Sequence, residues 1–446
     1  MKSLILTISF LISQTVLASH LLKDIEKTKI THKMNSSIAT GEYHFPNGLT
    51  VFLTENPKSP NVRISHWVKA GSLQETPGIT GIAHLFEHMM FRPLAPGQPT
   101  FFDITSKLGA NLNANTRFES TYYFTEVPTE SLSKALKAES DRFQKLVVSK
   151  ELLDVERKAV WSEYSTKFDA NPVVDLWFKI YQEAYKGHPF GWMIVGFRED
   201  LEKITAEDAN TFFQKYYKPN NIGLFVTGNF KSKEVLKQIA DLYENWKPGE
   251  ASQLPPPFAA KTKEIVAEGT LPSEAKFYLF GFRVPYFDQS NAKLFTLANY
   301  ILFDEDNGLF KKRLIDDKKM VAEVSDFNFS YDNGMLKAGI VALPSTKLAD
   351  LRSEIPKIRQ DFAALTPEQF SVYKRNLFIK MGESLQRNSQ LGDMLALTWG
   401  KYGNVDLSGE FATQPLEISK DEIQKFLDQY FGTDNFIYLA HKGQGK

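Results

Sequence analysis

The spacing of apolar and polar residues predicts the elements of the first half of the chain. Residues 43–53 alternate as a strand does and contain Asn47-Gly48, a dipeptide typical of a hairpin turn. We expect further strands over 62–68, 113–127 and 222–226. A short helix is predicted over 100–108, and longer helices over 131–147, 151–166 and 207–217. The pattern indicates an α+β protein.

One Pro-rich stretch, residues 247–258, divides the chain and is typical of a semi-rigid linker. The segment 204–230 aligns without a gap on 418–444, and both segments are predicted as helix, turn and strand. The identical pairs are Ile204 and Ile418, Phe212 and Phe426, Tyr216 and Tyr430, and Asn221 and Asn435. We therefore expect an internal duplication, with similar α+β domains at 37–246 and 263–446 and a linker over 247–262.

Residues 1–18 have the pattern of a cleaved secretory signal peptide: Lys2, an apolar run over 4–12, and small residues before Ser19. We therefore expect a secreted chain, placed in the periplasm. Residues 20–40 are polar and are predicted to be a mobile lead-in. Basic and acidic residues are equal in number, 53 of each, and form no basic tract, which argues against a nucleic-acid or membrane-surface partner. No second apolar run approaches the length of a membrane span, and the chain has no Cys.

The strongest candidate chemistry lies in residues 81–91, where His84 and His88 are four apart with Glu87 between them. In a helix this spacing puts both imidazoles on one face, one turn apart. Two neutral imidazoles can then share a metal ion, with nitrogen–metal distances of about 2.0–2.1 Å. Glu87 flanks the same face, where a carboxylate can take a proton from a water that the metal activates. This H-x-x-E-H spacing is the inverted form of the H-E-x-x-H zinc-protease motif.

A histidine pair on a solvated helix is the alternative to a metal site. The other side chains of the segment are nearly all apolar: Ile82, Ala83, Leu85, Phe86, Met89, Met90 and Phe91. A helix that is apolar nearly all round is buried. Imidazoles and a carboxylate on a buried helix are costly unless a partner satisfies them, and a metal ion would do so. The sequence therefore favours a metal site.

A hydrolytic zinc site needs a third protein ligand and keeps its fourth position for water. The candidates are Glu156 and Glu163, which are seven apart and share one face of the helix predicted over 151–166. The same helix is rich in other charged residues, so a solvated charged face is the alternative. The residues alone do not choose between the two glutamates.

The stretch from Gly71 through Glu75 to Phe91 resembles the signature of the inverzincin metallopeptidases, the group of pitrilysin, insulysin and mitochondrial processing peptidase. That family places its third zinc ligand in an E-x6-E pattern beyond the motif, and here Glu163 lies 75 residues past His88. The match continues through Asn113-Ala114, Glu119-x-Thr121-x-Tyr123, His188-Pro-Phe-Gly191 and Tyr217-x-Pro219-Asn-Asn221. It departs at Glu119, where Asp is more usual, and is much weaker in the second half.

The resemblance implies one Zn²⁺ per chain, with His84, His88 and Glu163 as ligands, Glu87 as general base, and Glu156 as a carboxylate behind the ligands. It also implies that substrate peptides pair with an edge strand near Asn113 and Ala114. The implied fold is two similar domains, each a mostly antiparallel sheet packed with helices, which together form half of a clamshell. Residues 37–246 would be the zinc-binding peptidase domain, and 263–446 an inactive repeat.

Active members of the family carry an Arg and a Tyr in the second domain that hold the substrate and stabilise the reaction intermediate. Leu314 stands where the pattern expects Arg, with Arg313 one place early, and Glu323 stands where it expects Tyr. We therefore expect a zinc-dependent endopeptidase that cleaves peptides or unfolded segments as the catalytic subunit of a two-chain chamber. A heterodimer with a related subunit that supplies the missing pair is favoured over a homodimer. The alternative is a non-catalytic structural or metal-binding subunit of the same fold.

Overall fold

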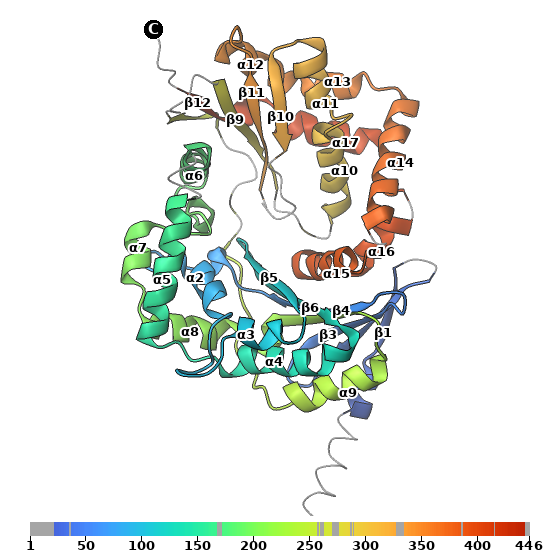
Figure 1. Ribbon diagram of the computed structural model, residues 1–446. Coiled ribbons are helices and arrows are strands. Elements are labelled where there is room, and N and C mark those ends of the chain that lie inside the picture. Colours follow the sequence, from blue (N-terminus) through green and yellow to red (C-terminus); the bar gives the residue numbers. More distant parts are fainter. Residues whose placement is uncertain are drawn as a thin grey trace, which may run out of the picture.

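The computed structural model describes residues 22–34, 37–166, 172–256, 258, 263–269, 276–285, 288, 290–326, 334–384, 387–413 and 415–441. The predicted signal peptide lies outside the described residues. The chain forms two sheets, each packed with helices, and the two sheets lie in separate halves of the molecule (Figure 1). The predicted α+β fold of two mostly antiparallel, helix-packed sheets is therefore confirmed.

The first half is built on a seven-stranded sheet with the order β1-β2-β3-β7-β4-β6-β5. Its strands are β1 (Ile30–Lys33), β2 (Ala39–His44), β3 (Thr50–Glu55), β4 (Asn61–Val68), β5 (Asn111–Thr116), β6 (Thr121–Pro128) and β7 (Ile222–Gly228). Its helices are α2 (Ile82–Met89), α3 (Phe101–Ser106), α4 (Leu132–Lys145), α5 (Lys150–Tyr164), α6 (Pro172–Ala184), α7 (Arg198–Lys203), α8 (Ala206–Tyr216) and α9 (Ser232–Tyr243). Only β3 and β7 pair in parallel, and β5 forms one edge of the sheet.

The second half is built on a five-stranded sheet with the order β10-β11-β9-β12-β8. Its strands are β8 (Ile265–Gly269), β9 (Lys276–Arg283), β10 (Val321–Asp326), β11 (Met335–Ala342) and β12 (Phe436–His441). Its helices are α10 (Ala292–Phe303), α11 (Leu309–Lys311), α12 (Leu348–Glu354), α13 (Ile358–Ala363), α14 (Pro367–Ser384), α15 (Asn388–Tyr402), α16 (Asp406–Thr413) and α17 (Lys420–Tyr430). This order repeats β5-β6-β4-β7-β3, and the parallel pair β8–β12 occupies the place of β3–β7.

The segment that repeats in the sequence has the same local structure in both halves. Helices α8 and α17 each begin with a capping box, at Thr205 and at Ser419. Each helix leads through a short 3₁₀ turn into a central strand of its sheet, β7 or β12. The matched residues Asn221 and Asn435, at the ends of these turns, are both buried. The shared topology and the shared caps support an internal duplication.

The halves exchange one helix each. Helix α6 of the first half packs on β8 and β12 of the second sheet, and α15 of the second half packs on β4 and β7 of the first sheet (Figure 1). The apolar cluster around α15 joins Leu395 and Trp399 to Phe52, Trp67 and Phe225. Each large apolar side chain buried in this way contributes about 1.5–3 kcal/mol. The exchange therefore fixes the position of one half relative to the other.

Two elements differ from the sequence-based expectation. Residues 22–34 are not a mobile lead-in: residues 22–27 are helical, β1 pairs with β2, and Ile25 and Met34 are fully buried. Residues 113–127 are not one strand but the hairpin β5–β6, whose turn is closed by the Arg117 amide donating to the Ser120 carbonyl at 2.8 Å. The Thr- and aromatic-rich composition favours strand throughout this segment and gives no sign of the break.

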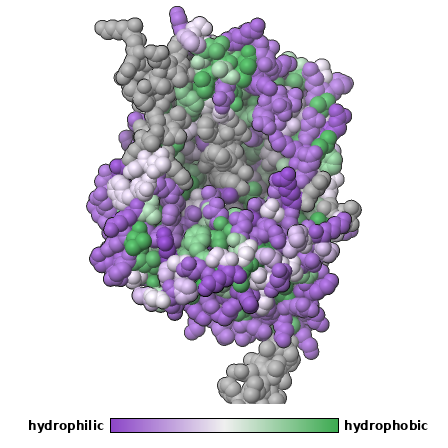
Figure 2. Space-filling model, in the orientation of Figure 1, coloured by the Kyte–Doolittle hydropathy of each residue, from purple (hydrophilic) through white to green (hydrophobic). Residues whose placement is uncertain are grey.

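Hydrophilic residues cover most of the visible face of the first half over α4, α5 and α9, with smaller hydrophobic areas between them (Figure 2). The exposed side of these helices is therefore polar, and their apolar side chains, such as Leu136, Val160 and Ile239, are buried beneath them. Within the described part of the chain, every helix is too short or too polar to span a bilayer.

A buried imidazole links the edge of the first sheet to the second half. His32 lies on β1, with Nε2 2.7 Å from the Glu42 carboxylate and Nδ1 2.7 Å from the carboxylate of Asp406 on α16. The hydrogen bond to Glu42, helped by Asp406, raises the pKa of His32 above its ordinary value despite the opposing effect of burial. When it is protonated, the ring joins two carboxylates from different halves.

We predict that this link stabilises the fold in acid and is lost in base. Because the folded pKa of His32 is raised, its stabilisation is complete below its ordinary value and disappears as pH rises through the folded value. His32→Gln should lower the free energy of unfolding, measured in urea, at about pH 6 and change it much less at about pH 9. An equal loss at both pH values would contradict the assignment.

Candidate metal and catalytic site

Helix α2, which carries the H-x-x-E-H residues, is locked at its first turn. Gly81 caps the helix with φ +86°, and a Cβ there would lie 2.4 Å from the Val195 carbonyl oxygen, so only glycine fits. The buried Glu75 carboxylate accepts hydrogen bonds from the Gly81 amide at 2.9 Å and the Ala83 amide at 3.0 Å. These bonds satisfy amides that have no partner within the helix, and they place a carboxylate at its positive end.

The apolar residues of α2 decide which way its polar residues face. Ile82, Ala83, Leu85, Phe86 and Met89 are all fully buried in the core of the first half. His84, Glu87 and His88 remain partly exposed on the side of the helix that faces α5 and β5. The prediction that this helix is buried is confirmed, and its polar side opens into a pocket.

Helix α5 supplies the acidic side of the same pocket. It begins after Ser149, whose hydroxyl caps the Leu152 amide at 3.2 Å, and it packs directly on α2. Leu153 and Val160 anchor its buried side. The Glu156 side chain is only 1% exposed and that of Glu163 is 22% exposed, so the two glutamates do not form a solvated face.

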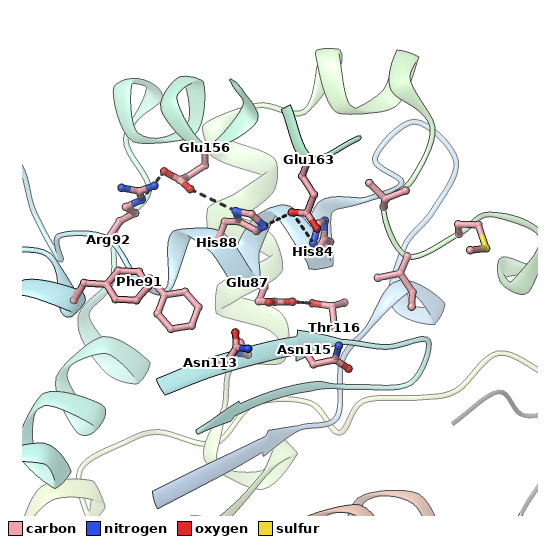
Figure 3. Close-up of a pocket in the computed structure, with 15 residues that line it drawn as sticks. His84, Glu87, His88, Phe91, Arg92, Asn113, Asn115, Thr116, Glu156 and Glu163 are labelled. Atoms are coloured by element: carbon pink, nitrogen blue, oxygen red, sulfur yellow. Dashed lines mark hydrogen bonds and ion pairs between the residues drawn. The ribbon is translucent and has the colours of Figure 1, made fainter. Parts of the chain in front are cut away.

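Three candidate ligands converge between α2 and α5. Glu163 Oε2 lies 3.8 Å from His84 Nε2 and 3.3 Å from His88 Nε2, with the carboxylate between the two rings (Figure 3). One ligand atom from each residue lies within 4.8 Å of the other two. Ligand atoms of a tetrahedral zinc site are about 3.4 Å apart, given metal–ligand distances of about 2.0–2.2 Å. Two imidazoles and one carboxylate at this separation fit a zinc ion.

Glu156 lies outside this cluster and contacts the opposite side of His88. Its carboxylate is 3.7 Å from His88 Nδ1 and 2.5 Å from Arg92 Nε, so that a charged chain runs from Arg92 through Glu156 to the imidazole (Figure 3). Burial alone would lower the pKa of His88, but the carboxylates of Glu163, Glu87 and Glu156 raise it above its ordinary value. At 3.7 Å the contact is an ion pair and not a hydrogen bond, so Glu156 acts on the His88 ring through its charge.

Glu87 points toward the edge strand instead of toward the ligands. The hydroxyl of Thr116, the last residue of β5, donates to Glu87 Oε2 at 2.5 Å. Burial raises the pKa of Glu87 above its ordinary value, while the hydrogen bonds from Thr116 and the charge of His88 oppose the rise. Glu87 is therefore next to the ligand cluster but free of it, as a proton acceptor should be.

These residues line one pocket of about 610 Å³, and edge strand β5 forms its wall. Asn113 and Ala114 lie on that wall, with Asn113 exposed and Ala114 partly buried. One side of β5 pairs with β6, and among the described residues no strand pairs with its other side. The pocket thus brings together all seven predicted site residues: His84, Glu87, His88, Asn113, Ala114, Glu156 and Glu163.

Sequence reasoning missed three contributions to the site: the helix cap by Glu75, the ion pair of Arg92, and the hydroxyl of Thr116. Arg92 lies four residues past His88 but beyond the end of α2 at Met89, so helix spacing did not indicate its place. No local signal joins Thr116 to Glu87, because their contact depends on how the sheet packs against α2.

Arg313 does not reach this pocket. Its guanidinium is bound by the carboxylates of Glu354 and Asp361, each at 2.6 Å. Leu314 is fully buried in the core of the second half, and Glu323 is exposed on β10. Arg313 and Leu314, which lie in the segment that the family pattern assigns to substrate binding, therefore make structural contacts within the second half.

Comparison with known proteins places this chain in a family. The model of the insulinase domain of peptidase family M16 matches residues 50–196, and that of the M16 inactive domain matches residues 203–377. The chain belongs to the M16 metallopeptidase family.

Known relatives and solved structures agree with this assignment. The chain is 24% identical over 395 residues to the zinc protease PqqE of Helicobacter pylori, covering 86% of this chain and 88% of the relative. It is 27% identical over 212 residues to the mitochondrial-processing peptidase subunit beta of Dictyostelium discoideum, covering 46% of this chain and 44% of the relative. A protease structure from Helicobacter pylori shares the fold with a TM-score of 0.82 at 22% identity, over 90% of this chain and 99% of that one. Pitrilysin matches with a TM-score of 0.72 at 17% identity over 93% of this chain, which spans 46% of the pitrilysin chain.

We predict that Glu163, and not Glu156, is the third ligand. Losing one of three ligands should empty the site, whereas losing a carboxylate behind a ligand typically weakens metal binding about 10–100-fold. After dialysis against a low zinc concentration, Glu163→Gln should hold much less zinc than Glu156→Gln. Glu151→Gln, the same change at an exposed position of α5, is the matched control and should retain the wild-type zinc content. A Glu156 variant emptier than the Glu163 variant would reverse the assignment.

Proposed function

We propose that this chain is a zinc-dependent endopeptidase that cleaves peptides or unfolded protein segments. The proposal rests mainly on one observation: Glu87 stands beside the His84–His88–Glu163 cluster, in a pocket walled by an open strand edge. Family membership and the zinc-protease relatives support the metal and the reaction class. The predicted signal peptide would carry the chain to the periplasm.

The residues of the pocket divide the work of peptide hydrolysis. A zinc ion at His84, His88 and Glu163 would supply Lewis-acid activation of water and of the substrate carbonyl. Glu87 takes the proton of the attacking water on its carboxylate and passes it to the leaving amine. The open edge of β5 pairs with the substrate backbone, so that main-chain hydrogen bonds orient the peptide with little demand on its sequence. Glu156, paired with Arg92, places a negative charge behind the ring of His88.

A non-catalytic or purely metal-binding subunit is the competing function. Such a subunit has no need of a carboxylate that is close to the ligands, held by a hydrogen bond, and turned toward the strand edge. Glu87 has all three properties. This geometry favours the peptidase.

Glu87→Gln should abolish peptide cleavage while leaving zinc bound. Glutamine keeps the size of the side chain and can still accept the Thr116 hydroxyl, but it cannot take up the proton. Loss of a general base typically costs about 10²–10⁴-fold in rate. Zinc content and cleavage of an unstructured fluorogenic peptide should be measured on the same preparation. Retained activity, or loss of most of the zinc, would remove Glu87 from this role.

We further propose that the active enzyme pairs this chain with a related subunit. Preorganised hydrogen-bond donors at a developing oxyanion commonly raise the rate about 10²–10³-fold. In this chain the segment expected to supply them holds Leu314, which is buried. It also holds Arg313, which is bound to Glu354 and Asp361. A partner whose second domain carries the Arg and the Tyr could supply both across the substrate chamber. A heterodimer with such a subunit supplies the Arg and the Tyr, whereas a second copy of this chain does not.

The isolated, zinc-loaded chain should accordingly be a poor peptidase. Adding a family member that has the Arg and Tyr but lacks H-x-x-E-H should raise kcat/KM at least tenfold, and mixing should produce a complex with one copy of each chain. Full activity from the isolated chain, with no gain on mixing, would show that the chain needs no partner.

A further inference from the structure

The hydroxyl of Thr116 connects the strand edge to the proposed base. Thr116 is the last residue of β5, it is 5% exposed, and its Oγ1 donates to Glu87 Oε2 at 2.5 Å. The backbone amide of Thr116 also donates to Glu87, so Thr116 holds this carboxylate through its main chain and through its hydroxyl. The hydroxyl contact, drawn in Figure 3, is the one that a substitution can remove.

Strand alternation accounts for this contact. Side chains of a strand point alternately to its two faces, so Leu112, Ala114 and Thr116 share one face of β5. Leu112 and Ala114 pack on the core of the first half, which also contains the apolar side of α2. Thr116, two residues further along, therefore reaches α2 at the position of Glu87, while Asn113 and Asn115 belong to the opposite face.

We propose that Thr116 is a positioning residue that aims Glu87 at the attacking water and ties this aim to the strand on which the substrate docks. This inference rests on the proposed peptidase function. A hydrogen bond to one carboxylate oxygen holds that oxygen away from the reaction and presents the other one. Because reacting groups that are misplaced by about 1 Å can lose about 10²-fold in rate, a carboxylate free to rotate is a poorer base.

A purely structural role is the competing explanation, and the chain offers a matched control for it. Thr121 lies directly opposite Thr116 on β6 and is also a buried threonine, and its hydroxyl donates to the Ala70 carbonyl at 2.8 Å without touching Glu87. Thr116→Val and Thr121→Val each remove one buried hydroxyl from the same hairpin at almost constant volume. Any loss that comes only from weakening the hairpin should appear in both variants.

The experiment compares zinc content, thermal stability, kcat and KM for Thr116→Val, Thr116→Ser and Thr121→Val with those of the wild type. If Thr116 positions the base, Thr116→Val should keep its zinc and its KM but lose at least tenfold in kcat. Thr116→Ser, which restores the hydroxyl, should recover most of that loss. Thr121→Val should keep the wild-type kcat.

Two kinetic results would overturn the proposal. One is a Thr116→Val variant with kcat within about twofold of the wild type, since misplacement of a reacting group by about 1 Å can cost about 10²-fold. The other is an equal loss in the Thr116 and Thr121 valine variants.

Crystal structures of the zinc-loaded wild type and Thr116→Val provide a readout that does not depend on activity. If the wild type cleaves no peptide even with the partner subunit added, the proposed function fails, but the position of Glu87 can still be compared between the two structures. A carboxylate that turns away from its wild-type position only in Thr116→Val supports the positioning role. An unchanged Glu87 carboxylate contradicts it.

Discussion

The anchoring of helix α2 is the constraint on which the site depends. Two imidazoles and a carboxylate can be held near the core only because the apolar sides of the helix are fully buried and its first turn is locked by Gly81 and the Glu75 cap. Because the burial of its apolar residues and the capped first turn fix the rotation of α2 about its axis and the direction in which the chain enters it, the polar side of α2 faces α5 and β5. The cost of burying these groups is offset by paired carboxylates and by Arg92, and a metal ion at the candidate ligands would offset more of it.

The exchange of helices between the halves extends this constraint to the whole molecule. Helix α15 covers the face of the first sheet at β4 and β7, and α6 does the same for the second sheet at β8 and β12. The edge strand β5 is thereby part of a sheet that is packed on both faces, while no strand of the described residues pairs with its outer edge. The candidate ligands, Glu87 and the strand edge can then keep fixed mutual positions, as the proposed catalytic site requires.

The sequence predicted most of the site because the decisive residues are close together in the chain or share a helix. Helix geometry alone predicts that His84 and His88 share one face of α2. The repeated pattern of helix, turn and strand indicated an internal duplication, which the matching strand order of the two sheets supports. The choice of Glu163 over Glu156 came from family resemblance, because both lie on one face and only packing on α2 separates them. Thr116 and the exchanged helices were missed, since periodicity shows that a face is buried but not which surface covers it.

The most direct test of this account is anomalous X-ray scattering at the zinc absorption edge from crystals of the purified, zinc-loaded chain. The account predicts one ion per chain, bound by His84, His88 and Glu163 with metal–ligand distances of about 2.0–2.2 Å, and with Glu156 and Glu87 outside the coordination sphere. An ion bound at any other place, or one that is coordinated by Glu156 in place of Glu163, would contradict it.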